Sequence, residues 1–208
     1  YFSRHFWELT SSQIGYMNLP YFLSALIALG VAPWISTKLG KKRGGMLTLA
    51  ISFGMAPMPY ILRLLGWFPE NGTDALFWTL VVFNALEVTL ILIAASLVAA
   101  MIADIVEDSE VKTGRRSEGI FFAANSFAQK AVNGLGVVVA GQILAIIQFP
   151  TQAKPGEVPE STIADLAIYY IPVIFFFYIL ALAVLSLYKI NRAGHEANLR
   201  QLSDSQRP

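Results

Sequence analysis

Five long apolar stretches, separated by short polar segments, constrain this chain more than any other feature of its sequence. A hydrocarbon core of about 30 Å is crossed by roughly 20 apolar residues in helical form. The stretches run from Ile14 to Ser36, Met46 to Trp67, Leu76 to Ala103, Ile120 to Phe149 and Leu166 to Tyr188. Helices are the spanning form that fits, because they satisfy their own backbone hydrogen bonds without water. The sequence therefore predicts an all-α, polytopic membrane protein with five full transmembrane helices.

The composition indicates a membrane protein, and the sequence contains little that favours an enzyme. The chain is 55% hydrophobic and 14% charged, with a mean hydropathy of +0.56, whereas ordinary soluble domains are about 25% charged. The two histidines, His5 and His195, lie near opposite ends of the chain, and no metal-ligand or nucleophile motif occurs. We therefore expect a lipid bilayer around the chain, and no catalytic residues, resident metal, cofactor or nucleic-acid partner.

Basic residues are concentrated in alternate connections between the spans. Most of the 15 Lys and Arg lie in segments 37–43 and 103–119 and after residue 188. The other connections carry mainly the acids Glu70, Asp74, Glu157, Glu160 and Asp165. Since basic residues favour the cytoplasmic side, the two basic connections and the C-terminus are predicted to be cytoplasmic. The expected location is the cell (inner or plasma) membrane, crossed several times.

The chain divides into three parts on this interpretation. Residues 1–12 are expected to be the end of a truncated sixth helix followed by an external loop. Residues 13–189 form the transmembrane bundle, and residues 190–208 form a cytoplasmic tail that is a short amphipathic helix or disordered. Pro57 and Pro59 are expected to bend the second full span, because proline removes a backbone donor from a helix.

Two ionisable side chains of opposite sign, Glu87 and Lys130, lie well inside the spans. Such groups are costly unless paired or hydrated, and are functional-site hypotheses by default. Counted at 1.5 Å per residue, Lys130 is about 18 Å from Glu118 and Glu87 is about 24 Å from Ala103, which predicts depths within about 6 Å of each other. The two could form a pair that transport makes and breaks, or a static pair. Glu87, with Asn84 one turn away, could instead bind a proton or cation independently or accept a substrate hydroxyl, or it could be a helix-packing residue hydrogen-bonded with Asn84.

Lys130 belongs to a polar stripe on the fourth span. Ser126, Gln129, Lys130 and Asn133 are spaced at i, i+3, i+4 and i+7, which places them on one face of a helix. Snorkelling does not easily rescue an ammonium group from the depth predicted for Lys130. The stripe therefore predicts a cavity-lining surface, and the alternative is a lysine buried in a structural hydrogen-bond network.

Segment 103–119, with the sequence ADIVEDSEVKTGRRSEG, is dense in charges of both signs and is expected to be a loop. Its order resembles the signature between helices ten and eleven of the glycoside-pentoside-hexuronide cation symporters, the melibiose permease branch of the major facilitator superfamily. Glu107 stands where aspartate is usual, and Asp108 where an aromatic residue is usual. The residues that match are Asp104, Glu110, Lys112, Gly114, Arg116, Glu118 and Gly119.

The resemblance covers essentially the whole chain and implies a C-terminal helical bundle. The five spans would be helices eight to twelve of a twelve-helix fold, and segment 37–43 (TKLGKKR) is similar to the basic loop between helices eight and nine. Helices seven, eight, ten and eleven of that fold line the cavity. By position, Lys130 would be the lysine of helix eleven, with Ser126 and Asn125 as its sugar-side neighbours. The charged signature residues would belong to the cytoplasmic gating loop.

The family implies a secondary transporter that couples a sugar or glycoside to Na⁺ or H⁺ by alternating access. The coupling cation would be bound mainly in the N-terminal half. The predicted substrate-binding or coupling residues are Lys130, Ser126, Asn125, Gln129, Asn133, Glu87 and Asn84. A lipid or lysolipid carrier of the same superfamily is the alternative within transport, and a pore or assembly subunit is the alternative outside it.

Overall fold

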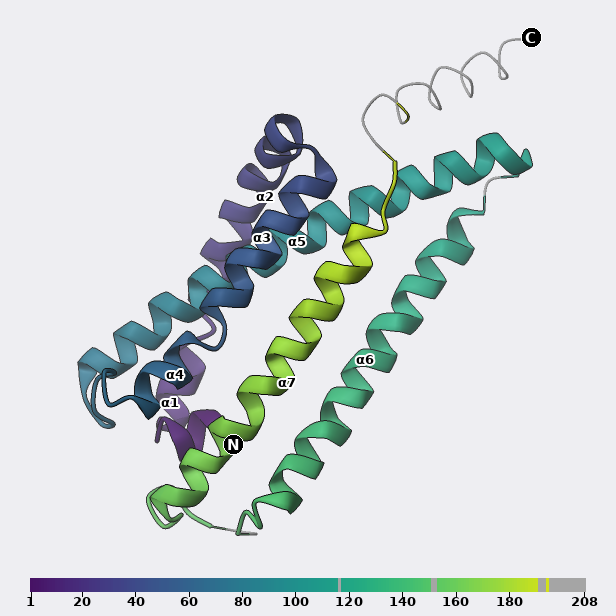
Figure 1. Ribbon diagram of the computed structural model, residues 1–208. Helices are drawn as coiled ribbons and strands as arrows, with labels where there is room; N and C mark the ends of the chain where they lie inside the picture. Colours follow the sequence, from purple (N-terminus) through teal and green to yellow (C-terminus); the bar gives the residue numbers. More distant parts are fainter. Residues whose placement is uncertain (116, 151–152, 191–193, 195–208) are drawn as a thin grey trace.

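The computed structural model describes residues 1–115, 117–150, 153–190 and 194, and every regular element in them is a helix (Figure 1). Five helical segments among these residues are long and apolar enough to cross a membrane. The predicted all-α fold with five spans is therefore confirmed. In chain order, the elements are the π-helix η1 (Phe2–Phe6) and the α-helices α1 (Ser11–Tyr16), α2 (Pro20–Leu39), α3 (Lys41–Met55), α4 (Met58–Leu64), α5 (Asp74–Thr113), α6 (Glu118–Ile146) and α7 (Glu160–Ser186).

Helices α2, α3, α5 and α7 form an elongated bundle (Figure 1). α5 packs against both α2 and α3, and α7 packs against α3. Ala28 and Ala32 of α2, which are 3% and 5% exposed, lie in a buried cluster with Ile93 and Leu97 of α5. Small side chains let helices approach closely, and such packing stabilises helix pairs in a lipid environment.

The second predicted span is broken at the place where the prolines predicted a bend. α3 ends at Met55 and α4 begins at Met58. Pro57 has no N–H to donate, so the hydrogen-bond ladder is interrupted there. The carbonyl of Pro57 then accepts the N–H of Ile61 at 3.0 Å, which starts the next helix. The predicted bend is confirmed.

α5 is longer than the span that the sequence predicts. It continues through Thr113 and ends at Gly114, whose φ of 68° is in the left-handed region that glycine adopts easily. The prediction of a loop across segment 103–119 was therefore wrong for most of that segment. No glycine or proline interrupts residues 104–113, and Lys112 pairs with Asp108 one turn away at 2.6 Å. Such i, i+4 pairs favour helix even in a strongly charged segment.

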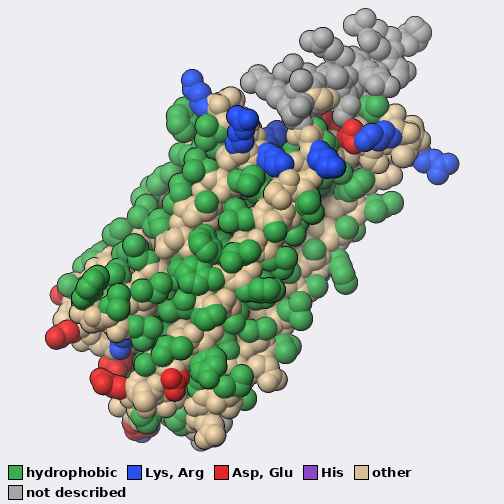
Figure 2. Space-filling view, viewed as in Figure 1, with side chains coloured by type: hydrophobic (Ala, Val, Ile, Leu, Met, Phe, Trp, Pro, Cys, Tyr) green, Lys and Arg blue, Asp and Glu red, His purple; other side chains and the backbone are tan. Residues whose placement is uncertain are grey.

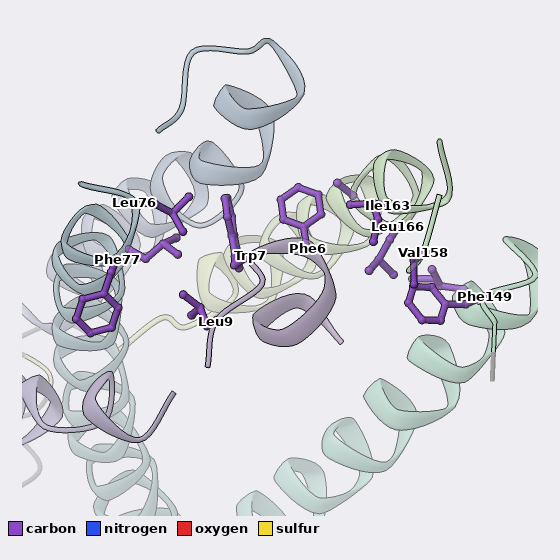
Figure 3. Close-up of a cluster of buried hydrophobic side chains, with 12 residues drawn as sticks. Phe6, Trp7, Leu9, Leu76, Phe77, Phe149, Val158, Ile163 and Leu166 are labelled. Atoms are coloured by element: carbon purple, nitrogen blue, oxygen red, sulfur yellow. The ribbon is translucent and has the colours of Figure 1, made fainter. Parts of the chain in front are cut away.

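Side chains from four parts of the chain meet in one large cluster, which we call the aromatic cluster (Figure 3). The N-terminal segment inserts Phe6 and Trp7 between residues of α5 and α7. The guanidinium carbon of Arg63 lies 4.4 Å from the centroid of the Phe6 ring, within cation–π range. The buried members are Phe6, Trp7, Leu9, Leu76, Phe77, Leu80, Ile143, Phe149, Val158, Ile163, Leu166 and Ala167.

Charges are sorted along the bundle. Figure 2 shows Lys and Arg side chains gathered at one end, and Asp and Glu side chains mainly at the other, with apolar side chains along the length between them. We call these the basic end and the acidic end. Lys41 begins α3 at the basic end, and Glu160 begins α7 at the acidic end. The sorting predicted from the alternate connections is therefore present in the folded chain.

α6 stands at the margin of the bundle (Figure 1). Ile143 is the only one of its residues that is buried. Ile143 belongs to the aromatic cluster, with Leu144 packed against it, while the remainder of α6 is almost entirely exposed. This exposure decides the surroundings of the residues that the sequence places on its polar stripe.

Candidate functional site

Asp104 is the most buried acid of the basic end. It lies on α5, only 3% of its surface is exposed, and its two carboxylate oxygens accept hydrogen bonds from different parts of the chain. Lys41 Nζ donates to Oδ1 at 2.5 Å, and the hydroxyl of Tyr188 donates to Oδ2 at 2.6 Å. Asp104 therefore joins the start of α3 to the segment that follows α7.

The end of α7 is held by a second lysine of the same connection. Lys42 Nζ donates to the carbonyl oxygens of Ser186 at 2.6 Å and Tyr188 at 2.7 Å. The last carbonyls of a helix have no intrahelical partner, and a cation there also interacts favourably with the helix dipole. We call Lys41, Lys42, Asp104 and Tyr188 the basic-end clamp.

Tyr188 is suited to its part in this clamp. Burial, together with its hydrogen bond to the carboxylate of Asp104, raises the pKa of the Tyr188 phenol above its ordinary value. The phenol therefore stays protonated and remains a donor across the physiological pH range. Tyr188 lies beyond Ser186, the last residue of α7.

The sequence predicted Asp104 as a site residue but gave no partner for it. Lys41 and Lys42 were recognised only as part of a basic connection, and Tyr188 only as the end of a span. The available signal was a pair of lysines directly before a span, with Asp104 as the first acid after the apolar part of a neighbouring span. Sequence spacing alone does not show that α3 and α5 pack together.

The other signature residues have separate positions. Lys112 forms an exposed i, i+4 pair with Asp108 on α5, and pairs of this kind contribute only about 0.3–0.5 kcal/mol. Glu110 is half-buried on the same helix. Glu118 is exposed in the first turn of α6, where an acid suits the helix dipole. Arg116, which was also predicted as a gating residue, lies outside the described residues.

The predicted polar stripe on α6 is open to the surroundings of the chain. Ser126, Gln129, Lys130 and Asn133 are exposed, and the neighbouring Asn125 is half-buried. Within the described ranges, none of these five side chains makes a hydrogen bond or an ion pair. The stripe is thus an unpartnered polar surface on the helix that the bundle covers least.

Glu87 and Lys130 do not pair in the structure. Glu87 is half-buried on α5, whereas Lys130 is exposed on α6, and no ion pair joins them. Ala103 and Glu118, from which the two depths were counted, do not lie at the same level of the bundle, because α5 continues beyond Ala103. The ten residues from Asp104 to Thr113 add about 15 Å of helix between Ala103 and the turn into α6. The residues of the predicted site therefore separate into a stripe on α6 and a pair, Asn84 and Glu87, on α5.

Glu87 lies near the phenol groups of neighbouring helices instead. Tyr60 of α4 and Tyr170 and Tyr178 of α7 are each close enough to interact electrostatically with its carboxyl group. The rings of Tyr60 and Tyr170 pack edge to face with centroids 5.3 Å apart. The sequence did not single out these tyrosines, because two of them lie in the otherwise apolar span from Leu166 to Tyr188.

A cavity of about 380 Å³ opens at the acidic end, beside Arg63. Glu8 and Glu160 also line it, and both acids interact electrostatically with Arg63. The guanidinium group donates to Asn71 Oδ1, so its charge is already engaged. No cluster of three or more metal-ligating side chains occurs in the part of the chain that the structure describes.

Residues 1–192 match the profile of the family described as MFS/sugar transport protein. The chain belongs to this family. That family consists of membrane transport proteins and not of enzymes. The resemblance that segment 103–119 indicated is thereby confirmed. No solved structure matches the chain.

Curated relatives of this MFS/sugar transport chain are named as symporters or transporters. It is 28% identical to the uncharacterized symporter sll1374 of Synechocystis sp., over 99% of this chain and 37% of the relative. It is 32% identical to the putative glycoside/cation symporter YagG of Escherichia coli, over 49% of this chain and 22% of the relative. It is 30% identical to the isoprimeverose transporter of Lactiplantibacillus pentosus, over 59% of this chain and 24% of the relative. The matched regions thus span 22% to 37% of the relatives' length.

Proposed function

We propose that this chain is the C-terminal half of a symporter that couples uptake of a sugar or glycoside to a Na⁺ or H⁺ gradient. The family match and the names of the relatives support the substrate class. The observation that carries the proposal is the unpartnered stripe on α6. Polar side chains within an apolar span are costly unless they face a cavity or a partner, and the stripe has no partner among the described residues.

In this proposal, α6 lines the path of the substrate. Ser126, Gln129 and Asn133 offer hydroxyl and amide groups at successive positions on one face, and Asn125 adjoins them. Such groups both donate and accept hydrogen bonds, as sugar hydroxyls do. Lys130 adds three donors and a positive charge to that face. The rest of the transporter would supply the opposite wall of the cavity and the main site for the coupling cation.

The two ends of the bundle would close the path in turn as the halves rock about a site near the midplane. We place the basic end at the cytoplasmic side, as the positive-inside rule requires. The basic-end clamp would then keep α3, α5 and α7 together as one rigid unit during this motion. A unit held by buried hydrogen bonds between its helices transmits rocking as a whole.

The test is uptake by the complete gene product in proteoliposomes. Labelled glycosides should accumulate when a Na⁺ or H⁺ gradient is imposed, with a rate that saturates as substrate concentration rises. Lys130→Ala should abolish accumulation and leave expression and membrane insertion intact, because a polar contact is lost on an exposed face. Lys154→Ala, in a connection at the acidic end, is the matched control and should transport normally.

Other outcomes would point to the rival functions. Passive, non-saturating conductance without coupling would favour a pore. Uptake of lysolipid in place of glycosides would favour a lipid carrier. Full gradient-driven uptake by Lys130→Ala would remove Lys130 from the mechanism.

A further inference from the structure

Glu87 is an acid inside a membrane span that has no basic partner in the described part of the chain. It is half-buried on α5, and no Lys, Arg or His of the described residues lies within ion-pair distance. An ionised carboxylate in such surroundings would need either a counter-charge or several hydrogen bonds. The structure records neither for Glu87 within the described ranges.

The titratable groups that interact electrostatically with Glu87 in the described residues carry no positive charge. They are Tyr60 of α4 and Tyr170 and Tyr178 of α7. The hydroxyl of Tyr178 already shares a 2.9 Å hydrogen bond with Ser52 of α3. Phenols ordinarily ionise near pH 10 (about three units above neutrality) and so are uncharged in cells. These neutral phenols therefore supply no counter-charge to a carboxylate.

Asn84 lies one turn before Glu87 on the same helix, and its side chain needs a hydrogen-bond donor. Its amide oxygen Oδ1 is buried and accepts no hydrogen bond from the described residues. Side chains at i and i+3 of a helix are neighbours, with Cβ atoms about 5–6 Å apart. A carboxylic acid carries an O–H donor, whereas a carboxylate carries none. One proton on Glu87 would therefore remove an unbalanced charge and provide a donor for a buried acceptor.

We propose that Asn84 and Glu87 form a proton-binding site inside this half, in which the carboxylic acid of Glu87 donates its hydrogen bond to Asn84 Oδ1. Both residues lie on α5, and the site contains no residue of α6. It is therefore separate from the stripe that carries Lys130. The ligand is a proton from water, taken up when Glu87 is carboxylate and released when it ionises. Its link to transport, though not its existence, rests on the proposed function.

The site can be tested without any transport assay, by infrared spectroscopy of the purified complete gene product. A protonated carboxylic acid gives a carbonyl stretching band that a carboxylate lacks. The wild-type protein should show this band at neutral pH, and Glu87→Gln should lose it. Asp74→Asn, which changes an exposed acid in the first turn of the same helix, should keep it. Asn84→Ala should shift the band to higher frequency, because the acid loses its acceptor.

A measurement on the unchanged sequence guards against a variant that fails to fold. Glutamate labelled with ¹³C at its side-chain carboxyl should shift the band in wild-type protein, and raising the pH should remove it. A band that persists in folded Glu87→Gln, or no band in wild-type protein at neutral pH, would overturn the proposal. So would loss of the band on replacing choline by Na⁺ at constant pH, because Glu87 would then be a sodium ligand.

A transport assay distinguishes a failure of the proton site from a failure of the proposed function. If both hold, uptake by the wild-type protein should depend on pH, and Glu87→Gln should lose that dependence. An infrared band without uptake of any glycoside would leave the proton site standing and refute the symporter. Gradient-driven uptake by wild-type protein that lacks the band would refute the proton site and leave the symporter standing.

Discussion

Asp104 accepts hydrogen bonds from Lys41, 63 positions before it, and from Tyr188, 84 positions after it. Its side chain is 4% exposed, while that of Lys41 is 26% exposed. Removing one partner of a fully buried ion pair costs about 3–5 kcal/mol, because the other charge is left without compensation. The partial exposure of Lys41 reduces this cost, since water reaches that side of the pair.

Lys41→Met is therefore expected to destabilise the bundle by about 1–3 kcal/mol, the value of a hydrogen bond to a charged group whose partner stays buried. The measurement is thermal unfolding of the purified protein in detergent. Lys38→Met is the matched control, because Lys38 is an exposed lysine just before the same connection and forms no ion pair among the described residues. Equal melting temperatures for the two variants would show that Asp104 does not depend on Lys41.

Replacing Gly44, which lies at the same end of the bundle, with a larger residue is expected to cause a steric clash. A methyl group on Gly44 would overlap Cγ2 of Ile35 and would lie 3.4 Å from Cδ1 of Leu97. Ile35 is β-branched and has little rotamer freedom, so α2 and α3 would have to separate. Gly44→Ala should lower stability by about 1–3 kcal/mol, as overpacking does. Gly54→Ala on the same helix, where the methyl group meets nothing within 4 Å, should be neutral or slightly stabilising in the same unfolding assay.

Among the elements, α5 differs most from the usual dimensions of a spanning helix. Its 40 residues correspond to about 60 Å, twice the thickness of a hydrocarbon core. The excess lies at the basic end, beyond Asp104, and turns into α6 through Gly114. Because Gly114 has a positive φ, its lack of a side chain is what permits the helix to end there.

Gly114→Ala should therefore destabilise the end of α5 by about 1–2 kcal/mol, the cost of placing an L-residue in the left-handed region. Hydrogen exchange should become faster in residues 104–113 and remain unchanged in the centre of the helix. Gly119→Ala, inside the first turn of α6 and facing open space, is the control and should not increase exchange. Unchanged exchange in residues 104–113 of Gly114→Ala would mean that Gly114 does not determine where α5 ends.

The elements also show how far sequence could predict this structure. The five spans and the break at Pro57 were predictable, because long apolar runs and proline act locally. The helix after Ala103 was missed because polarity was taken as loop, although the Asp108–Lys112 spacing was a helical signal. Pairing of Glu87 with Lys130 was inferred from depth alone, and depth along a helix does not say which neighbour a side chain faces. Contacts between α3, α5 and α7 depend on packing that no local pattern encodes.

At the scale of the whole molecule, the separation of charges predicts sidedness. Lys38 lies at the basic end and Lys154 in the connection before α7, and both are exposed. The chain has no cysteine, so single cysteines introduced here report without background from these residues. In cells that make the complete gene product with its other cysteines replaced, Lys154→Cys should react with an impermeant maleimide from outside. Lys38→Cys should react only after permeabilisation.

Permeabilised cells, in which both positions should be labelled, control for reactivity. Labelling of Lys38→Cys from outside in intact cells would reverse the orientation and, with it, the assignment of the clamp to the cytoplasmic end. The sites for labelling avoid Gly114 and Gly156, whose positive φ values make cysteine unfavourable there.

The bonds from Lys42 to the end of α7 can form only after nearly all of this chain has been translated. Lys42 is translated 144 residues before Ser186, the first residue whose carbonyl it binds. All five spans have been made by the time Ser186 is added, yet Lys42 still lacks the Tyr188 carbonyl and Asp104 still lacks the phenol of the same residue. A chain stopped between these residues would contain all five spans, but its basic end would be held only by the Lys41–Asp104 and Lys42–Ser186 bonds. The last two residues of this segment, Leu187 and Tyr188, therefore complete the set of bonds that joins α3, α5 and the end of α7.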